Sequence, residues 1–386
     1  MKKIYYITAV FATLFLVGCG DGIDLPGVNV ETDLNKIPLP DNNVNLEQVE
    51  LKPSTEPMLH EGLHTEEDFQ RIRDKKAAGE EPWVSAYQLL VESQFSQKTA
   101  DTYPTEWIKR GVSGDENYMN AARGATIAYQ QALRWKIEQD DEYAAKAVEN
   151  LNKWVQTCVG VTGNTNLSLA AGLYGYEFAI AGELLRDYEG WDRADFAAFQ
   201  NWLLKVFYPA NDDFLKRHHD TNPLHYWANW CLCNIAAKMA IGIVTDRRDI
   251  YNEGIGHLQT GDTNGRLRRA IYHDYAPDYN FAQWQESGRD QGHTLMCVGL
   301  MGIICQLAWS QGDDFFAYDD NLFMRACEYA ACCNYTNETV PYTTYIWQKQ
   351  SQWGYPIPEE QTTLGGGKWI KRAIWALPYY HYKGVK

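Results

Sequence analysis

The sequence predicts an all-α protein, in which consecutive helical hairpins form an incomplete α/α toroid with a loop-rich C-terminal tail. From Thr65 onward, apolar residues recur at three-and-four spacing in one segment after another. In successive pairs, one segment is nearly all apolar, as in "LMCVGLMGIICQLAW" (residues 295–309), and this composition suits inner helices ringed by amphipathic outer ones. No fixed repeat period is visible, which counts against a helical solenoid as the alternative.

The predicted helices follow one another with short polar turns between them. The first begins at Thr65, a capping residue followed by acidic residues, and it ends at Gly79. The segments expected to be helical are residues 65–79, 81–95, 117–139, 141–159, 167–188, 193–210, 222–245, 247–261, 289–312 and 320–336. Strand-like alternation is rare before Val340, and the tail beyond it is aromatic and rich in loops.

The N-terminus predicts export and lipid attachment. "MKKIYYITAVFATLFLVGCG" has two lysines, an apolar run and then Leu-Val-Gly-Cys, which resembles the signal of bacterial lipoproteins, where the cysteine is lipidated. The run is too short and too early to be a convincing membrane span. We therefore expect a signal peptide over residues 1–19, lipidation of Cys19, a tether over 20–58 and the toroid over 59–386. The protein would be anchored to the bacterial outer membrane, facing the periplasm or the cell surface.

The charge balance narrows the class of partner. The formal net charge is −15, from 35 Lys+Arg against 50 Asp+Glu, which argues against nucleic acid because phosphate binding needs a basic footprint. An anionic ligand stays possible, since a local pocket can oppose the global field. The 14 Trp and 25 Tyr suit sugar faces as well as a protein core.

The cysteines predict neither a metal site nor a cofactor. Apart from Cys19, the eight remaining cysteines of nine lie in apolar helical runs, without the paired spacing of zinc ligands. We expect them to be small core residues. Disulfide pairing and the oligomeric state stay open.

One polar stretch opens a predicted inner helix at "HHDTNPLHYWANW", residues 218–230. Asn222 and Pro223 predict the helix start, which would place His225 and Asn229 one turn apart on one face. The aromatic residues beside them are Tyr226, Trp227 and Trp230. The alternative is a core histidine satisfied by a carbonyl group.

A second polar stretch, "WQESGRDQGHTLM" (residues 284–296), opens another inner helix. Arg289 and His293 would lie one helical turn apart, as would Glu286 and Asp290. The alternative is an ion-paired helix cap, since a buried arginine needs an acid. In a toroid the ends of inner helices gather around one cleft, so we expect both stretches to form one site. Two further residues of this stretch expected to bind ligand are Gln285 and Gln291.

Several motifs together resemble the alginate lyase superfamily, most closely its branch classed as polysaccharide lyase family 38. They are "HYWANWCLCN", "QESGRDQGHT", "AWSQGDDFFAYDDN", "EYAACCNYTNETVPYTTY" and "IWALPYYHY". The resemblance runs from about Asn117 to the end of the chain. It implies an α/α toroid and β-elimination on an anionic, uronate-containing polysaccharide such as mannuronan or glucuronan. The residues at positions that match these motifs are His225, Asn229, Glu286, Arg289 and His293.

The chain departs from the family pattern at four places. Cys231 stands where the family usually has Asp in "HYWANWDLCN". Ala373, Ala376 and Tyr380 stand at the changed places of "RAIWALPYYHY", and family chains commonly extend further beyond this motif.

The resemblance suggests roles for the site residues. A uronate lyase removes the proton at C5 and must first neutralise the neighbouring carboxylate, for which Asn229, Arg289 and a histidine would serve. His225 is the first choice for base or neutraliser, and His293 is the second. The candidates for the acid that protonates the leaving oxygen are Tyr226, Tyr345 and Tyr382. The residues expected to bind the sugar chain are Trp227, Trp230, Gln285, Glu286, Gln291, Tyr345 and Tyr382.

Two other functions remain possible. A glycoside hydrolase on the same fold needs two carboxylates across a cleft. One would be Glu286 or Asp290, and the candidates for the other are Glu177, Glu183 and Asp220. A surface lipoprotein that binds glycans without cleaving them would fit the aromatic content and the lipid tether. The sequence leaves open which polymer is cut and whether cleavage is endo or exo.

Overall fold

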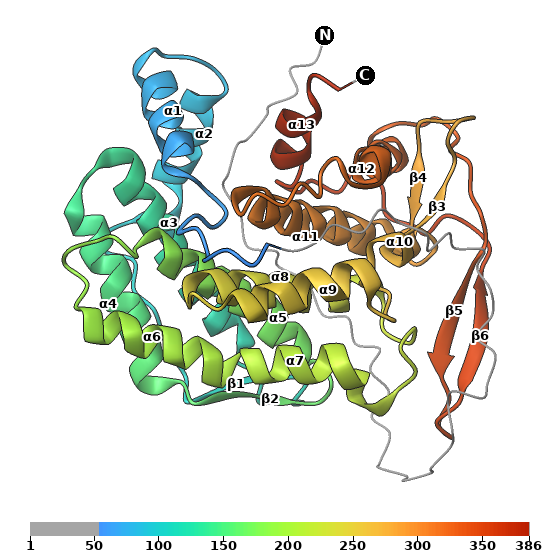
Figure 1. The fold of residues 1–386 in the computed structure, drawn as a ribbon, viewed down its shortest axis with the longest axis horizontal. Helices are drawn as coiled ribbons and strands as arrows, with labels where there is room; N and C mark the ends of the chain where they lie inside the picture. The colour runs from blue at the N-terminus through green and yellow to red at the C-terminus, as the bar shows by residue number, and fades with distance from the viewer. Residues whose placement is uncertain (1–53, 386) are drawn as a thin grey trace. The chain divides into compact units, whose positions relative to one another are not determined.

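The computed structural model describes residues 54–385, and helices predominate in it (Figure 1). Their contacts divide the described chain into two compact units. Unit 1 comprises Thr55–Asn211 and Ala237–Tyr251, and unit 2 comprises Asp212–Ala236 and the chain from Asn252 onward. The expected signal peptide, the expected lipidation at Cys19 and most of the expected tether lie outside the described residues.

Helices that pair in chain order build unit 1. They are α1 (Glu66–Ala77), α2 (Trp83–Glu92), α3 (Tyr118–Glu138), α4 (Asp141–Thr157), α5 (Leu167–Leu184) and α6 (Arg193–Val206). Thr65 begins α1 with a capping box, in which its hydroxyl accepts the N–H of Asp68 and the Asp68 carboxylate accepts the N–H of Thr65. Asp140 and Asp192 cap α4 and α6 by accepting backbone N–H groups. These helix starts therefore follow from local sequence.

The core of unit 1 lies along α3 and α5. Helix α5 is buried over nearly its whole length, and α3 packs against both α4 and α5. Gly124 allows α3 to approach α4, and Gly182 allows α5 to approach α6, because a Cβ atom at these positions would overlap the rings of Trp154 and Phe199 respectively. A short parallel pair, β1 (Trp107–Arg110) and β2 (Gly160–Gly163), joins the segments that precede α3 and α5.

Unit 2 combines a helical core with short hairpins. Its elements are α10 (Leu267–Ala270), β3 (Ile271–Asp274), β4 (Ala282–Trp284), α11 (Gln291–Ser310), α12 (Tyr318–Tyr335), β5 (Tyr345–Gln350), β6 (Pro356–Gln361) and α13 (Ala376–Tyr382). Both hairpins, β3–β4 and β5–β6, are antiparallel. The helices whose residues are divided between the two units are α7 (Tyr208–Arg217), α8 (Ala228–Val244) and α9 (Arg248–Thr260).

Helix α11 is the central helix of unit 2. It packs against both α12 and α13. It is long and apolar enough to cross a membrane, but 78% of its apolar window is buried inside the protein. Burial in the core therefore accounts for its composition, as the sequence predicts for an inner helix.

The expected helix over residues 222–245 begins later in the structure, at Ala228. Asn222 holds the preceding segment in turns: its Oδ1 accepts the N–H of Leu224 at 3.0 Å, and its Nδ2 donates to the carbonyl of Gln348 at 3.1 Å. The prediction that His225 and Asn229 share a helical face is therefore wrong, because His225 lies before α8.

The expected helix over residues 289–312 also begins later, at Gln291. Residues 285–288 form a 3-10 turn, and Asp290 is the N-cap of α11. The prediction that Arg289 and His293 lie one turn apart on a helix is wrong for this reason. Glu286 and Asp290 are one helical turn apart, because the N–H of Asp290 donates to the carbonyl of Glu286 at 3.2 Å, although α11 itself begins after them. The short strands β1 to β4 also precede Val340, although each spans only three or four residues.

Candidate functional site

The two polar stretches meet in unit 2, where the 3-10 turn at residues 285–288 caps α8. Oε1 of Glu286 accepts the backbone N–H of Asn229 at 3.1 Å and also its side-chain amide. Oε1 of Gln285 accepts the backbone N–H of Ala228 at 2.9 Å. The first N–H groups of a helix lack partners within it and carry partial positive charge, so an acidic side chain from elsewhere in the chain stabilises this helix start.

Arg289 completes this assembly. Its Nη1 lies 3.3 Å from Oε2 of Glu286, and its guanidinium stands over the ring of Trp227 at 5.2 Å. Its side chain keeps 17% exposure, whereas Glu286 has none. The buried Glu286 therefore holds Asn229 and Arg289 in position. It has no exposed surface for a ligand, although the sequence suggested it as a ligand-binding residue.

Asp290 and His293 form a second pair beside Arg289. Oδ1 of Asp290 accepts the backbone N–H of His293 at 2.8 Å, and Oδ2 is hydrogen-bonded to His293 Nδ1. Burial works to raise the pKa of Asp290, but the hydrogen bond and charge of His293 outweigh it and hold this pKa below its usual value. Because an ionised Asp290 only accepts, Nδ1 of a neutral His293 carries the proton, and Nε2 is the basic nitrogen of the ring.

His225 is held by β5. Its Nδ1 accepts the backbone N–H of Gln350 at 2.8 Å, and its carbonyl accepts the indole N–H of Trp347 at 2.7 Å. Burial lowers the pKa of His225 to about 4, so the ring is neutral near pH 7. Since a backbone N–H can only donate, the ring proton lies on Nε2, and His225 is suited to donate a hydrogen bond and poorly suited to accept a proton.

An aromatic stack joins these two groups. The ring of Trp347 stacks on His225 at 5.8 Å and on Trp227 at 5.0 Å, and Trp227 also contacts Tyr345 at 6.2 Å. The Tyr345 hydroxyl lies 3.3 Å from Oδ1 of Asn264, and burial raises its pKa, which keeps it protonated.

Three residues of the site did not stand out in the sequence. Trp347, Gln348 and Gln350 come from β5, more than a hundred residues after His225. The run "YIWQKQ" does not alternate in polarity, and its burial does not alternate either, so no local pattern marks them. Nothing in the local sequence indicates that this strand meets His225.

Other predicted residues pack within unit 2. The ring of Tyr226 contacts the rings of His225 and Phe214 at 4.9 and 5.1 Å, and Trp230 contacts Phe214 at 6.0 Å. Gln291 is buried and its amide donates to the carbonyls of Ser287 and Gly365, at 3.2 and 3.4 Å. These contacts assign Gln291 to holding a loop.

Tyr382 is also drawn into the core. Its hydroxyl donates to the carbonyl of Phe316 at 2.6 Å, and its ring contacts Phe323 at 6.3 Å. The structure therefore does not bring it to Arg289. Cys231, at a position where the resemblance expects Asp, is fully buried, and burial raises the pKa of its thiol to about 12. All eight cysteines of residues 54–385 are free and buried.

Most of the carboxylates that a hydrolase would need already have basic side chains as partners. Glu286 and Asp290 face Arg289 and His293. In unit 1, Glu183 pairs with Arg186 at 2.8 Å. Asp220 is exposed and lies 3.7 Å from Arg217.

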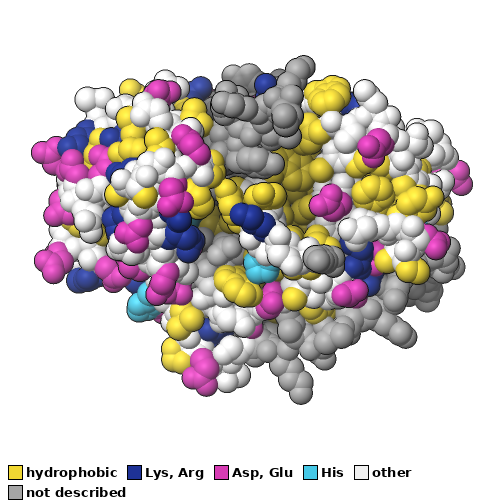
Figure 2. Space-filling view, turned by 90° about the horizontal axis from the view of Figure 1, so that it is seen from above, with side chains coloured by type: hydrophobic (Ala, Val, Ile, Leu, Met, Phe, Trp, Pro, Cys, Tyr) yellow, Lys and Arg dark blue, Asp and Glu magenta, His cyan; other side chains and the backbone are white. Residues whose placement is uncertain are grey.

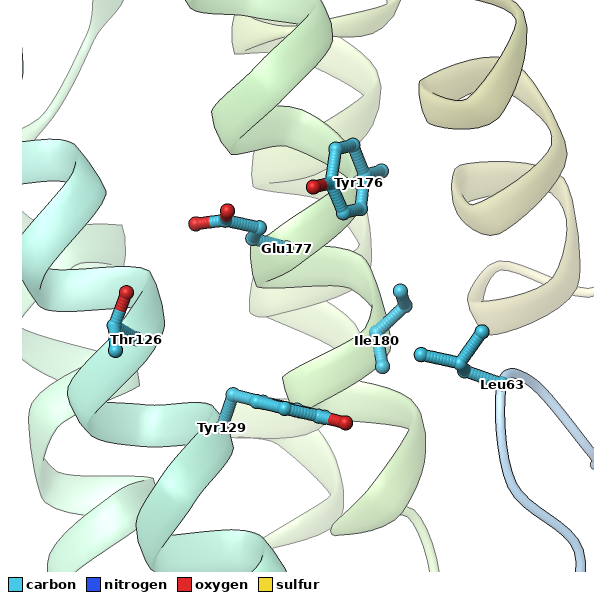
Figure 3. A pocket seen from close by; sticks show the side chains of 6 residues that line it. All are labelled: Leu63, Thr126, Tyr129, Tyr176, Glu177 and Ile180. Atoms are coloured by element: carbon cyan, nitrogen blue, oxygen red, sulfur yellow. The ribbon is translucent and has the colours of Figure 1, made fainter. Parts of the chain in front are cut away.

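Glu177 is different. Figure 3 shows it with Thr126, Tyr129 and Tyr176 around a small pocket of unit 1. Burial raises the pKa of Glu177 to about 8, against an opposing hydrogen bond from Tyr176. It is therefore protonated near neutral pH, but it has no described carboxylate partner within this pocket lining.

The visible surface agrees with the charge composition. Figure 2 shows acidic and basic side chains interspersed over the described part of this face, without a continuous basic area.

Comparisons with known proteins identify the family and the fold. The sequence profile described as "Alginate lyase" matches residues 72–338. The structure is similar to a histidine-to-alanine variant of alginate lyase A1-III complexed with a tetrasaccharide, with a TM-score of 0.56 and 13% identity, over 74% of this chain and 82% of that one. It is also similar to alginate lyase A1-III from Sphingomonas species A1, with a TM-score of 0.51 and 12% identity, over 72% and 79% of the two chains.

A search among curated protein sequences gives no match. At the identities of the two solved structures, the likeness speaks for the fold alone. It confirms the predicted all-α, toroid-type fold.

Proposed function

Because the chain belongs to the alginate lyase family of polysaccharide lyases, we propose that it cleaves a uronate-containing polysaccharide by β-elimination. The observation that carries this proposal is the fixed assembly of Arg289, Asn229 and Glu286. It holds a partly exposed guanidinium beside a buried amide, and both are bound by a glutamate side chain that has no exposed surface. Mannuronan, guluronan and glucuronan are the polymers that such a site would take.

The first task of the site is to neutralise the carboxylate of the sugar. The C5 proton is weakly acidic while the adjacent carboxylate keeps its full charge, so donors aimed at its oxygens lower the barrier. Arg289 supplies positive charge, and Asn229 and Nε2–H of His225 supply hydrogen bonds. The neutral, Nε2-protonated state of His225 supports this role and disfavours the role of base.

The second task is proton transfer. We assign the base to Nε2 of His293, which Asp290 orients through the hydrogen bond at Nδ1. As the C5 proton leaves, the electron pair forms the C4–C5 double bond and the C4–O bond breaks. Tyr345, protonated and in contact with Trp227, is our candidate for the acid that protonates the leaving oxygen.

The decisive experiment mixes the chain lacking residues 1–19 with polymannuronate, polyguluronate and glucuronan separately. An increase in ultraviolet absorbance from the unsaturated uronate product is expected with one of them, and it would name the substrate. New reducing ends without that absorbance would replace the proposal with a hydrolase. Binding without new ends would replace it with a glycan-binding lipoprotein.

We further propose that the protein is a lipoprotein anchored through Cys19 to the outer membrane. The support is the Leu-Val-Gly-Cys sequence at residues 16–19, after an apolar run that follows two lysines. Cys19→Ser should abolish labelling by a radioactive fatty acid and release the protein from the membrane fraction. Unchanged labelling would overturn this proposal.

A further inference from the structure

A second arginine lies beside the candidate site in unit 2. Helix α10 contacts the 3-10 turn that carries Glu286, and Arg269 is on this helix. Arg269 is half-buried, and its buried Nε has no hydrogen-bond acceptor. Within residues 54–385, no hydrogen bond or ion pair engages its guanidinium, which distinguishes it from its neighbours in unit 2.

Neighbouring arginines of unit 2 are paired with acidic side chains. Arg325 lies 2.7 Å from Oδ2 of Asp274. Arg268, the residue before Arg269, lies 3.8 Å from the same carboxylate and also pairs with Asp319. Acids are plentiful in a chain with a net charge of −15, so a half-buried arginine without one is unusual.

The surroundings of Arg269 favour an incoming anion. Burial, and then the charge of Arg266, lower the pKa of Arg269, while Tyr345 and Asp262 oppose them. Asp262 is exposed, so water weakens its attraction. The groups around Arg269 therefore do not fully neutralise its positive charge.

Tyr345 links Arg269 to the reaction site. Its hydroxyl contacts Asn264, in the loop that leads into α10, and its ring contacts Trp227 at 6.2 Å. Arg289 stands over that same Trp227 ring. Arg269 interacts electrostatically with Tyr345, and Arg289 stands over Trp227, so these two aromatic residues in contact connect two separate cationic groups of one unit.

We propose that Arg269 binds the carboxylate of a second uronate residue, next to the one whose carboxylate Arg289 and Asn229 engage. Every sugar of a polyuronate carries a carboxylate, so a chain held at Arg289 presents another to a nearby cation. A guanidinium is suited to this task because its planar donors match a carboxylate in a bidentate manner. The inference rests on the proposed function, and it makes Arg269 a determinant of specificity for consecutive uronates.

The test compares Arg269→Gln with Arg247→Gln in the chain lacking residues 1–19. Arg247 is an exposed arginine of unit 1 that pairs with Asp249, so its variant removes the same charge without touching the site. We expect Arg269→Gln to raise KM for the cleaved polyuronate about tenfold, with kcat within about twofold of the parent. The dependence of kcat/KM on salt should also weaken, whereas Arg247→Gln should match the parent.

A second variant guards against loss of folding. Arg269→Lys keeps the charge and loses the bidentate geometry, so KM should rise about threefold. A KM equal to that of the parent in both folded variants would overturn the inference and leave the lyase assignment standing. If the parent neither cleaves nor binds any of the three polyuronates, the proposed function and this inference both fall.

Discussion

Unit 1 and unit 2 each contain a glutamate with a buried carboxyl group, and the two carboxyl groups differ in their hydrogen-bond and charge partners. In unit 2, Glu286 accepts hydrogen bonds from Asn229 and faces Arg289 at 3.3 Å. In unit 1, Oε2 of Glu177 is buried without a partner among the described residues, and its pKa rises to about 8 (Figure 3). Burial, opposed only by a hydrogen bond from Tyr176, thus keeps Glu177 protonated, whereas in unit 2 both oxygens of Glu286 have partners and join it to Asn229 and Arg289.

The largest effect on activity is expected at Arg289, which we propose contacts the substrate. Arg289→Ala should lower kcat/KM on the cleaved polymer by about a hundredfold to a thousandfold, because the developing charge loses a preorganised donor. Product absorbance measures the rate, and circular dichroism checks that the fold persists. Arg217→Ala, which removes an exposed arginine paired with Asp213, is the control and should keep parental activity. Parental activity in folded Arg289→Ala would contradict the site assignment.

Glu286→Gln tests whether the buried carboxylate positions its partners. The substitution keeps the shape and an acceptor for Asn229 but leaves Arg289 without its buried acid. We expect the free energy of unfolding to fall by about 3 kcal/mol, together with a loss of activity. Denaturant titration measures the stability.

Glu359→Gln is the matched control for this change. Glu359 is an exposed glutamate 3.5 Å from Lys349, and its loss should alter stability by about 0.5 kcal/mol or less. Equal effects of the two substitutions would show that Glu286 does not hold Arg289 in place.

Glu177→Gln tests whether the buried carboxyl group of unit 1 is protonated in the folded state. The pKa of Glu177 is about 8 in the folded chain against a model-peptide value of 4.5, so between these pH values the folded state keeps a proton that the unfolded state loses. Wild-type stability should therefore fall as pH rises through this window.

In Glu177→Gln this fall of the free energy of unfolding with pH should disappear. Near the upper end of the window, the variant's free energy of unfolding should be about 2 kcal/mol larger than that of the parent. Denaturant titrations across the pH range measure the difference. Parallel stability profiles of the two proteins would show that Glu177 is ionised in the folded state.

The smallest effect concerns the strand that holds His225. Trp347→Phe keeps an aromatic ring against His225 but removes the indole N–H that donates to the carbonyl of His225 at 2.7 Å, together with part of the stacked ring. We expect kcat/KM to fall about fivefold, since one hydrogen bond contributes about 1 kcal/mol. Trp353→Phe, at an exposed tryptophan of the same hairpin, should behave as the parent. An equal response of both variants would remove β5 from the site.

Local sequence was enough to predict the helices and the two polar stretches. Capping by Thr65 and the apolar character of α11 depend on neighbours a few residues away, so periodicity and caps reveal them. The motif positions likewise indicated His225, Asn229, Glu286, Arg289 and His293 as one site. The exact starts of α8 and α11 were mispredicted, because side chains distant in the sequence compete for the backbone there.

The sequence by itself therefore determined the fold class and the polar residues around which the site is built. Tertiary structure alone decided their roles: Gln350 sets the tautomer of His225 across 125 residues, and Gln285 and Glu286 cap α8 across 57. It also decided that Arg268 meets an acid and that Arg269 meets none among residues 54–385. The physical reason is that hydrogen bonds and charge pairs depend on distance in space, which residue spacing along the chain does not contain.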